Sequence, residues 1–555
     1  MRKILPLPLA ALLLASIAVA QTPSDHPRPG ASDDKDAVSK QAAKDKADEA
    51  AEGTIKPPVD EQAVSTRHVA QTHRGPMKYT ATTGTLTIRD DDAHPIASVF
   101  YVAYVADGVK DYGHRPITFF YNGGPGSSSL WLHMGSFAPM RVQTASPEYI
   151  KPAPYPFGPN RETLLDKTDM VFIDMVGAGY SRPLGTKSGK DFWGVDQDAD
   201  AFARAIQRYV TKTARWQSPK VIFGESYGTT RSGALAYQLQ DRGMALNGVV
   251  LLSSIMNYGI RQPGFDRLYV NYLPSYTATA WYHHKLANPP TDLATAVAQA
   301  RAFAEGPYAS ALAQGSALDE PGRQRIAEQM AALTGLSPQF LLASNLRVDL
   351  PRFQKELLRA DRLTIGRFDS RYTGVDTDAA GDRPEYDASD TAISGAFIAT
   401  FSDYLVRDLH YRTDMPYRVS AYGTTGFDWD WKHKAPGDRM AQAAPNTAVD
   451  LSTAMRTNPY LHVLSLNGYY DMATPFFGTE YDLRHMELRG PQAANLAFRY
   501  YPSGHMAYLN PDALAAMHAD LAAFYDEAVS AATSRGPTLP AQISAGRAGA
   551  SGPNR

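Results

Sequence analysis

One serine lies in a setting that favours nucleophilic chemistry. Gly224, Glu225, Ser226, Tyr227 and Gly228 form a G-x-S-x-G motif between a short apolar run and a segment with helical spacing. In such a strand–turn–helix arrangement the serine occupies the tip of a tight turn, and the glycines let the backbone pack closely. The motif by itself is weak, and an ordinary strand-to-helix turn is the alternative. A serine hydroxyl attacks only when a base takes its proton, so a base must lie nearby.

Two later residues suit the roles of that base and its partner. Asp471 follows an apolar run that ends at Leu466, and His505 follows one that ends at Tyr501. Open α/β sheets place their sites at the carboxyl ends of strands, and the order Ser, Asp, His is the one expected of such a fold. We expect His505 to move the proton of Ser226, and Asp471 to orient His505. A single histidine or aspartate after a strand more often caps a backbone group or is solvated. The occurrence of all three residue types in the expected order favours a triad.

A glycine-rich loop at 122–129 (NGGPGSSS) follows another apolar run. Glycine lets backbone N–H groups come close to a ligand oxygen. In this type of fold one oxyanion donor comes from such a loop, and the other from the residue after the nucleophile. We therefore predict an oxyanion hole made by the N–H groups of Gly124 and Tyr227. A flexible surface loop is the alternative; a phosphate loop is disfavoured because the G-x-x-x-x-G-K-[ST] pattern is absent.

Short apolar runs alternate with helical patterns on both sides of the motif. This alternation favours an α/β fold with a mostly parallel sheet covered on both faces, and short links predict that its first strands are antiparallel. Helices are expected at 195–210, 229–242 and 511–528. Strands are expected at 77–82, 84–88, 97–106, 116–121, 170–174, 220–223, 248–253, 461–466 and 497–501.

The alternation of strand and helix patterns changes along the chain, and this change predicts domain boundaries. Helical patterns dominate 259–445, which we interpret as an insertion, or cap, between two parts of one core at 73–258 and 446–533. Few large apolar residues occur at 21–72 and at 534–555, so we predict a disordered linker and a disordered tail there.

The first twenty residues are typical of a cleaved signal peptide. Arg2 and Lys3 precede an apolar run at 4–19, and Ala18-Val19-Ala20 resembles a cleavage site. An uncleaved anchor is the alternative, but the run is short for a membrane span and contains prolines. No later segment is apolar for long enough to span a membrane. We therefore expect a secreted or periplasmic protein with no membrane span after cleavage.

Composition excludes several kinds of site. The net charge of −2 gives no sign of a nucleic-acid partner, and the absence of cysteine excludes disulfides, thiol nucleophiles and cysteine-based zinc sites. No H-E-x-x-H motif occurs, so we predict no metal and no cofactor. The acidic stretch with Asp376 and Asp378 is interpreted as a solvated loop rather than a calcium site. The aromatic cluster at 427–431 (FDWDW) is interpreted as core, with a substrate pocket as the alternative.

Five ordered motifs together resemble the serine carboxypeptidase family. They are YNGGPGSSSL at 121–130, VFID with GAGYS at 171–181, GESY at 224–227, an aspartate box with Gly468, Asp471 and Gly478, and GHM at 504–506 followed by Pro511. The resemblance implies the α/β-hydrolase fold with a helical insertion, and removal of C-terminal residues from peptides through an acyl-enzyme.

The resemblance also implies a clamp for the terminal carboxylate of a peptide. By position the clamp residues are Asn122, Gly123 and Glu225, whereas a second glutamate of the family aligns with Ser136. A glutamate donates a hydrogen bond only when protonated, so we expect peptide affinity to improve at acidic pH.

Two other classes of function remain open. One is a related serine hydrolase such as an aminopeptidase, esterase or acyltransferase, because a fold does not fix a substrate. The other is a non-catalytic binding protein on the same scaffold. The sequence does not predict the oligomeric state.

Overall fold

A computed structural model of the chain describes residues 57–533. The predicted signal peptide at 1–20, the predicted tail at 534–555 and most of the predicted linker lie outside the described residues. All described residues belong to a single unit that begins at Pro57.

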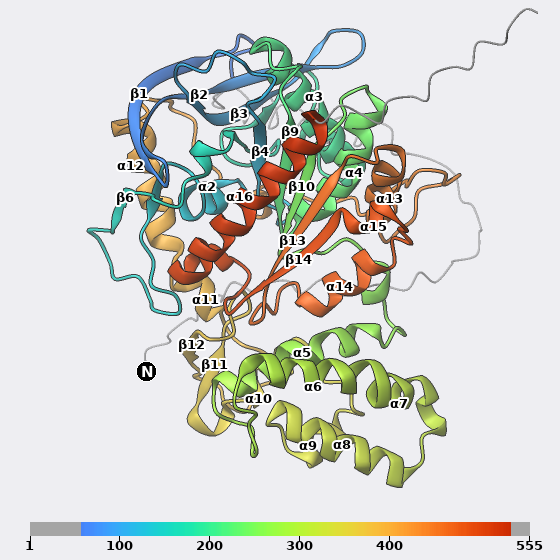
Figure 1. Cartoon of the computed structure of the whole chain (residues 1–555). Helices are drawn as coiled ribbons and strands as arrows, with labels where there is room; N and C mark the ends of the chain where they lie inside the picture. Colours follow the sequence, from blue (N-terminus) through green and yellow to red (C-terminus); the bar gives the residue numbers. More distant parts are fainter. Residues whose placement is uncertain (1–56, 534–555) are drawn as a thin grey trace, which may run out of the picture. The chain divides into compact units, whose positions relative to one another are not determined.

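A ten-stranded mixed sheet forms the centre of this unit (Figure 1). Its strand order is β1-β2-β3-β7-β4-β9-β10-β13-β14, and β8 (Arg182–Pro183) pairs with β3. The first four strands in this order pair antiparallel, and every later pair is parallel. The strands are β1 (Ala63–Thr72), β2 (Gly75–Arg89), β3 (Pro95–Ala106), β4 (Ile117–Tyr121), β7 (Asp169–Ile173), β9 (Lys220–Glu225), β10 (Gly248–Leu252), β13 (His462–Gly468) and β14 (Leu496–Tyr501).

Helices cover both faces of the sheet, so the α/β-hydrolase fold class predicted from the sequence is confirmed. Successive residues of β4 illustrate the two layers, since Phe119 belongs to one hydrophobic core and Phe120 to the other. The core with Phe119 includes residues of α3 (Val195–Lys212), α4 (Tyr227–Asp241) and α13 (Ala448–Thr457). The core with Phe120 includes residues of α2 (Leu130–Gly135), α12 (Ser394–Arg407) and α16 (Pro511–Thr533).

The N-terminal edge of the sheet differs from the prediction. Ala63–Thr72, inside the predicted linker at 21–72, forms β1 and pairs along its length with β2, so the linker prediction is wrong there. The polar composition of this strand gave no strand signal in the sequence, because backbone pairing with β2, and not burial of apolar side chains, stabilises the strand. The two strands predicted at 77–82 and 84–88 are one continuous strand. Gly84 lies within it, and a Cβ there would be 2.3 Å from the backbone O of Gln62, so this glycine permits close strand approach and makes no turn.

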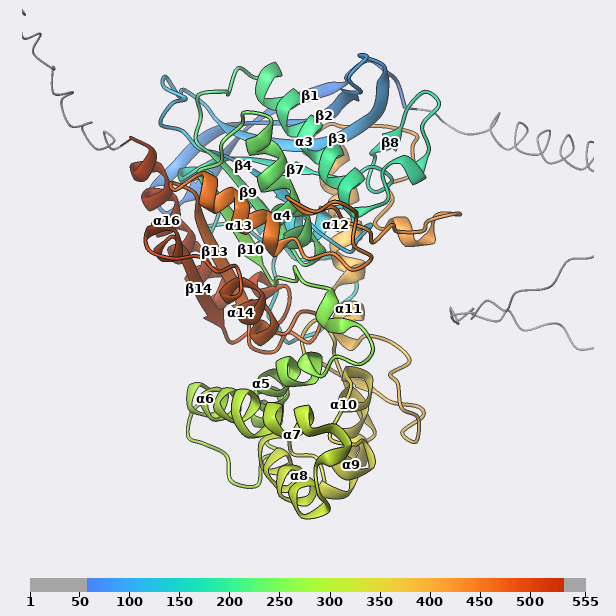
Figure 2. The same cartoon turned by 90° about the vertical axis from the view of Figure 1, so that its right-hand side faces the viewer.

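The chain between β10 and β13 is mostly helical, and its helices divide between two places. α12 packs on the sheet in the core that contains Phe120. α5 to α10 share a core of their own with residues that follow β13, including Tyr470 and Phe476, and Figure 2 shows them gathered together. The elements are α5 (Arg267–Tyr282), α6 (Leu293–Phe303), α7 (Ala309–Gln314), α8 (Glu320–Thr334), α9 (Pro338–Ala343), α10 (Leu350–Glu356), β11 (Leu363–Ile365), β12 (Thr373–Val375), α11 (Ala388–Thr391) and α12.

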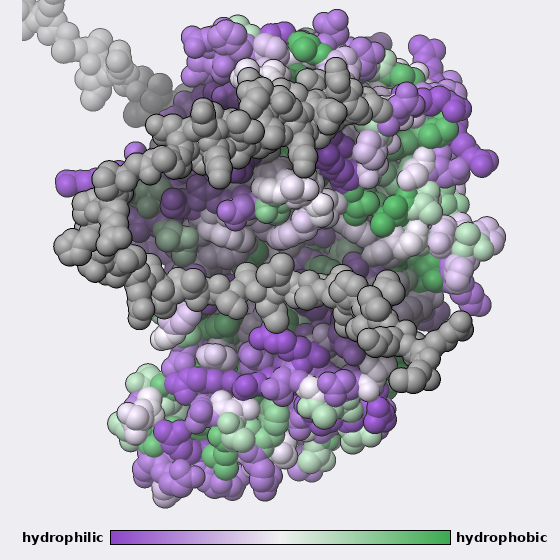
Figure 3. All heavy atoms as spheres, turned by 180° about the vertical axis from the view of Figure 1, so that it is seen from behind, coloured by the Kyte–Doolittle hydropathy of each residue, from purple (hydrophilic) through white to green (hydrophobic). Residues whose placement is uncertain are grey.

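Among residues 57–533, no helix has both the length and the apolar character needed to cross a membrane. On the face drawn in Figure 3, hydrophobic residues are interspersed with hydrophilic ones over the coloured surface.

Candidate active site

Ser226 occupies a tight turn between β9 and α4. Its backbone has φ 61° and ψ −130°, a left-handed φ that is rare for a residue with a side chain and is found at functional turns. A Cβ on Gly224 would be 2.3 Å from the backbone O of Gly228, so the turn requires glycine at that position. The N–H of Ser226 donates to the O of Leu252 on the neighbouring strand, at 3.0 Å. The strand–turn–helix setting therefore has the geometry expected of an exposed nucleophile.

Asp471 and His505 are joined directly. Nδ1 of His505 lies 2.8 Å from Oδ2 of Asp471, and both residues are buried. Oδ1 of Asp471 accepts hydrogen bonds from the N–H groups of Ala473 and Thr474, at 2.8 and 2.9 Å. These bonds hold the carboxylate where it orients the imidazole and stabilises its charged form.

Ser226 and His505 line the same pocket, which has a volume of about 150 Å³. The position of His505 is fixed by its backbone, because its N–H donates to Phe368 O at 2.6 Å and its O accepts from Ser253 Oγ at 2.6 Å. Among the described residues no hydrogen bond joins Ser226 Oγ to His505. Catalytic hydrogen bonds are often long before substrate arrives, so the shared pocket is compatible with proton transfer between them.

Thr474 is a site residue that the sequence analysis did not identify. Its Oγ1 lies 2.6 Å from Asp471 Oδ2 and 3.1 Å from His505 Nδ1. The same oxygen lies 2.9 Å from the backbone O of Ser253. Because a hydroxyl has a single proton, Asp471 and the carbonyl of Ser253 compete for it, while Oγ1 can accept from the protonated Nδ1 of His505. The only signal for Thr474 in the sequence is its position shortly after Asp471.

The glycine-rich loop packs directly on the start of α4. A Cβ on Gly123 would be 2.4 Å from the backbone N of Tyr227 and 2.5 Å from that of Gly228. Tyr227 is the first residue of α4, where N–H groups lack partners inside the helix. Within residues 57–533 no acceptor is bonded to the N–H of Gly124 or of Tyr227. Both predicted oxyanion donors are therefore free to donate, and Gly124 lines the pocket.

A buried ion pair positions this loop. Arg231 of α4 donates from Nε to Asp198 Oδ2 of α3 at 2.6 Å, and from Nη1 to the backbone O of Asn122 at 2.7 Å. The other end of the loop is held by Asp174, whose Oδ1 accepts from the N–H of Ser129 at 2.7 Å. Burial raises the pKa of Asp174 to about 6.

Glu225 lies at the base of the pocket, beside Asn122. Burial raises the pKa of Glu225 to about 7, although His505, Tyr508 and Asn122 act in the opposite direction. The hydroxyl of Tyr508 lies close enough to Glu225 to lower its pKa, but no hydrogen bond of normal geometry reaches Glu225 Oε2 or that hydroxyl among the described residues. Oδ1 of Asn122 accepts from the N–H of Leu132 at 2.9 Å, which leaves its amide NH₂ to donate. Asn122, Gly123 and Glu225 all line the pocket, as the predicted clamp requires.

Ser136, in contrast, is not part of the pocket. It is buried at the end of α2 and donates its hydroxyl to the backbone O of Leu132. The position that the resemblance assigns to a second glutamate therefore carries no carboxyl group and lies outside the pocket, although Asp390 brings a carboxyl group to the pocket from another segment.

Arg367 is a second pocket residue that the sequence analysis missed. It is exposed, its guanidinium carbon lies 5.1 Å from the ring centroid of Phe368, and it makes no ion pair within the described chain. Its backbone N–H donates to Asp387 Oδ1 at 3.0 Å. No motif marked it, because its position depends on how the segment between β10 and β13 folds. The remaining pocket residues are Ser127, Trp131, Phe368, Asp390 and Met506.

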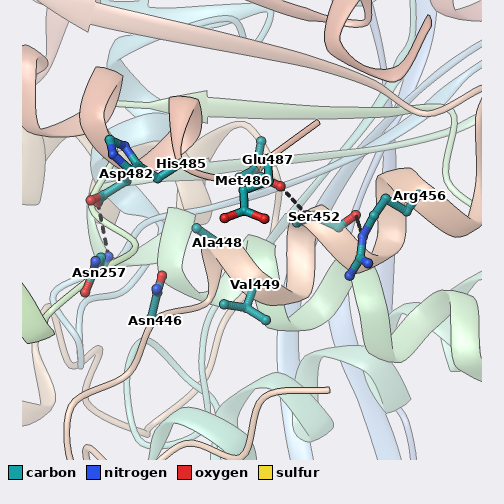
Figure 4. A pocket seen from close by; sticks show the side chains of 10 residues that line it. All are labelled: Asn257, Asn446, Ala448, Val449, Ser452, Arg456, Asp482, His485, Met486 and Glu487. Atoms are coloured by element: carbon teal, nitrogen blue, oxygen red, sulfur yellow. Dashed lines mark hydrogen bonds between the residues drawn. The ribbon is translucent and has the colours of Figure 1, made fainter. Parts of the chain in front are cut away.

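A second pocket, of about 310 Å³, contains none of the predicted site residues (Figure 4). Asp482 lies at its edge and accepts from the N–H of Asn257 at 3.1 Å, and burial raises its pKa to about 7. Ser452 Oγ donates to the backbone O of Met486 at 2.7 Å across the pocket floor. The candidate nucleophile and base therefore belong to the other pocket.

Two minor sequence features have structural explanations. Asp376 is buried and pairs with Lys355 Nζ at 2.5 Å, so its interpretation as a solvated residue is wrong. In the aromatic cluster at 427–431, Trp429 packs edge-on against the ring of Tyr227, with centroids 5.2 Å apart. The cluster belongs to the packing around the turn of Ser226 and does not line the pocket that contains it.

Comparison with known proteins supports the resemblance seen in the motifs. Residues 73–284 match the family model described as serine carboxypeptidase. This range includes Ser226 and the glycine-rich loop, whereas Asp471 and His505 lie beyond it. A search of curated proteins found no match.

Several solved structures are similar in arrangement at low sequence identity. The Kex1 prohormone-processing carboxypeptidase of Saccharomyces cerevisiae is 13% identical, with 81% of this chain and 92% of that chain covered and a TM-score of 0.48. The proline iminopeptidase of Mycobacterium smegmatis is 13% identical, with 81% and 99% covered and a TM-score of 0.33. A putative aryl esterase of Burkholderia cenocepacia is also 13% identical, with 80% and 99% covered and a TM-score of 0.32. Likeness at this level does not distinguish among the activities of these proteins.

Proposed function

We propose that this protein is a serine carboxypeptidase that removes C-terminal residues from peptides through an acyl-enzyme. The observation that carries the proposal is a single pocket lined by Ser226, His505 and Glu225. The candidate nucleophile Ser226 and its base His505 lie there beside the carboxyl group of Glu225. Because the pKa of Glu225 is raised, this carboxyl group can be protonated and can donate a hydrogen bond to the carboxylate of a peptide.

In the acylation step, His505 takes the proton of Ser226 as Oγ attacks the carbonyl carbon of the last peptide bond. The carbonyl oxygen becomes an oxyanion and accepts hydrogen bonds from the N–H groups of Gly124 and Tyr227. Asp471 stabilises the imidazolium that forms. The C–N bond then breaks, and His505 gives the proton to the nitrogen of the departing amino acid.

Water completes the cycle. His505 takes a proton from a water molecule, whose oxygen attacks the ester carbon of the acyl-enzyme. The same oxyanion donors stabilise the second tetrahedral intermediate. When the C–O bond breaks, His505 returns the proton to Ser226 Oγ, and the shortened peptide leaves with a new carboxylate.

Recognition of the terminal carboxylate depends on donors at the base of the pocket. The amide of Asn122, the N–H of Gly123 and the protonated carboxyl of Glu225 can each donate a hydrogen bond. Arg367 adds a fixed positive charge that no carboxylate of the described chain pairs with, and an arginine can bind a carboxylate through two parallel bonds. Arg367 can therefore help to bind the terminal carboxylate, a role that the second glutamate of the family would have and that Ser136 cannot fill.

The test compares three blocked peptides that differ only at the C-terminus: a free acid, its amide and its methyl ester. We expect hydrolysis of the acid with release of the C-terminal amino acid, identified by mass spectrometry, and loss of this activity in Ser226→Ala. Preference for the amide or the ester over the acid contradicts the proposal.

A related serine hydrolase is the second candidate, and the position of Ser136 favours it. Without a carboxyl group at that place the clamp is incomplete, and an esterase or acyltransferase needs no clamp. The same three substrates separate the two candidates. A non-catalytic role is tested by fluorophosphonate labelling, which we expect in the wild type and not in Ser226→Ala.

We further propose that the protein acts outside the cytoplasm, as a secreted or periplasmic enzyme, after removal of residues 1–20. The basic start, the apolar run and the Ala-x-Ala site support this. Mass spectrometry of the exported protein is expected to find Gln21 at its N-terminus. The segment 259–445 is proposed as a cap whose residues Arg367 and Phe368 complete the pocket.

A further inference from the structure

Three metal-ligating side chains from distant parts of the chain meet far from the turn that holds Ser226. His73 lies in the turn between β1 and β2, Glu162 follows β6 (Phe157–Pro159), and His518 belongs to α16. Nε2 of His73 is 2.8 Å from Oε2 of Glu162, and Nδ1 of His518 is 3.9 Å from the same oxygen. The ligand atoms all lie within 4.8 Å of one another. We propose that His73, Glu162 and His518 bind a divalent transition-metal ion, with Zn²⁺ as the best match.

The distances suit such an ion. Zinc binds imidazole nitrogen and carboxylate oxygen at about 2.0–2.2 Å, so in a tetrahedral site two ligand atoms stand roughly 3.3 Å apart. The separations of 2.8 and 3.9 Å from Glu162 lie on either side of that value, and the two imidazole rings, which stack with centroids 4.3 Å apart, would have to turn relative to each other for both to bind one ion. Two imidazoles and one carboxylate form a donor set that zinc uses, and water fills the fourth position.

A buried carboxylate behind His518 provides an independent observation. Nε2 of His518 and Oδ1 of Asp166 are 3.7 Å apart, and neither atom has a hydrogen-bond partner among residues 57–533. The side chains of Asp166 and His518 are only 3% and 8% exposed, so unpaired atoms there are costly. If Nδ1 of His518 binds a metal, Nε2 carries the proton and faces Asp166. This is the carboxylate–histidine–metal arrangement in which an outer carboxylate orients the ligand.

Charge and access also favour a cation. Glu162 and Asp166 bring two carboxylates to the cluster, and the guanidinium of Arg74, which lies 3.9 Å from Asp166, offsets part of this negative charge. The side chain of His73 is half exposed, which gives an ion a route from solvent. Arg74 and Asp166 also line a surface pocket of about 340 Å³.

A metal here would tie the N-terminal hairpin to the C-terminal helix α16. Figure 1 shows these elements in blue and red, at the two ends of the described chain. A protein without cysteine cannot join such segments by a disulfide; a bound ion would instead stabilise the folded state, because its ligands come together only there. The sequence analysis predicted no metal because no short spacing motif connects these residues.

The experiment titrates chelator-treated protein with ZnCl₂ and measures stoichiometry by calorimetry and the unfolding midpoint by scanning fluorimetry. We expect one equivalent of zinc per chain and a midpoint that rises by several degrees. Binding should weaken at least tenfold in His73→Gln and His518→Ala, and roughly 10- to 100-fold in Asp166→Asn. In the wild type, Co²⁺ in place of zinc should give the visible absorption of a four-coordinate site.

The matched control is His94→Ala, which removes an exposed histidine of the β2–β3 turn that belongs to no such cluster. It should bind zinc as the wild type does. The variants at His518 and Asp166 change buried residues and could fail to fold. His73→Gln changes a half-exposed turn residue, so it should fold and still test the proposal. The proposal is overturned if the wild type binds no zinc, or if His73→Gln binds it with unchanged affinity.

Discussion

Thr474 contacts both members of the Asp471–His505 pair, and its hydroxyl gives a first prediction at the scale of single residues. Thr474→Val keeps the shape of the side chain and removes Oγ1, while the backbone bonds to Asp471 remain. The imidazole then loses one of its neighbours, and we expect kcat to fall about tenfold with little change in KM. Steady-state kinetics on a blocked peptide measure this. Thr474→Ser should restore the rate, and a Thr474→Val variant as active as the wild type contradicts the role.

Glu225 gives a prediction about pH. Its pKa of about 7 means that it is protonated, and able to donate, on the acidic side of neutrality. As pH rises through 7 it becomes an anion that repels the carboxylate of the peptide, so KM for a free-acid peptide should rise. A KM profile between pH 5 and 9 measures the effect.

Glu225→Gln is the matched variant for this profile. Glutamine donates at every pH, so the rise in KM around pH 7 should disappear while that of the wild type persists. A wild-type KM that is flat or that improves towards alkaline pH contradicts the assignment.

Residue identities were predictable where a short motif carries the chemistry. Ser226 and Asp471 follow buried strands, and His505 follows the partly exposed edge strand β14, all in a fixed order, so their assignment as a candidate triad needed no coordinates. Thr474 and Arg367 were not predictable. Their roles depend on which side chain a loop brings to the pocket, and that contact is set by tertiary packing.

At the scale of elements, the contact between the glycine-rich loop and α4 gives a third prediction. In Gly123→Ala the new Cβ would lie 2.4 Å from the backbone N of Tyr227. Moving the backbone of the loop or of the helix start to relieve this clash costs free energy. The loop must move away from the helix start, which displaces an oxyanion donor. Losing one such donor typically costs about 10²–10³ in kcat, and we expect a loss of that order.

Gly306→Ala is the control, since a Cβ there meets nothing within 4 Å. It should leave kcat unchanged. Thermal unfolding of both variants shows whether Gly123→Ala remains folded, and a folded Gly123→Ala enzyme of normal kcat contradicts the role of this contact.

A buried histidine links two elements beside the sheet and gives a fourth prediction. His433 Nδ1 lies 2.6 Å from Asp196 Oδ1 of α3, and Nε2 lies 2.9 Å from Asp450 Oδ2 of α13. Burial lowers the pKa of His433, but the hydrogen bonds to both carboxylates outweigh it and raise the pKa to about 9.

Because this folded-state pKa exceeds the ordinary value of 6.5, the stabilisation is fully present below pH 6.5 and is lost as pH rises through 9. The loss in the free energy of unfolding is about 3 kcal/mol at most, because Asp196 is partly solvated. Urea unfolding between pH 6 and 9.5 measures it. In His433→Gln the decline over this window should be smaller than in the wild type, and an equal decline contradicts the assignment.

At the scale of the whole molecule, the helices α5 to α10 have a core that reaches the loop of Asp471. Phe353 is fully buried there and stacks on Tyr276 at 3.8 Å between centroids. Tyr470 and Met472, which flank Asp471 in the chain, belong to the same core. We expect Phe353→Ala to lower stability by about 3–5 kcal/mol, and loss of activity on heating to follow the same transition. Calorimetry with two separate transitions contradicts this coupling.

The sheet was largely predictable because its strands are short apolar runs, as at β9 and β10. β1 was not, since its side chains are mostly polar and its stability comes from backbone pairing with β2. The division of the inserted helices between two cores was also not predictable. Helical spacing shows that a segment is amphipathic, but it does not show which element its apolar face packs against.

The position of β1 has a consequence for association between molecules. It forms the outermost strand on its side of the sheet, is ten residues long and carries the exposed, charged side chain of Arg67. Charged side chains on a border strand discourage pairing with other molecules. A protease that removed the chain up to Thr72 would uncover the fifteen-residue strand β2, with its row of unpaired amides and carbonyls. We expect the trimmed protein to aggregate through strand addition while Ser226 and its neighbours are still in place.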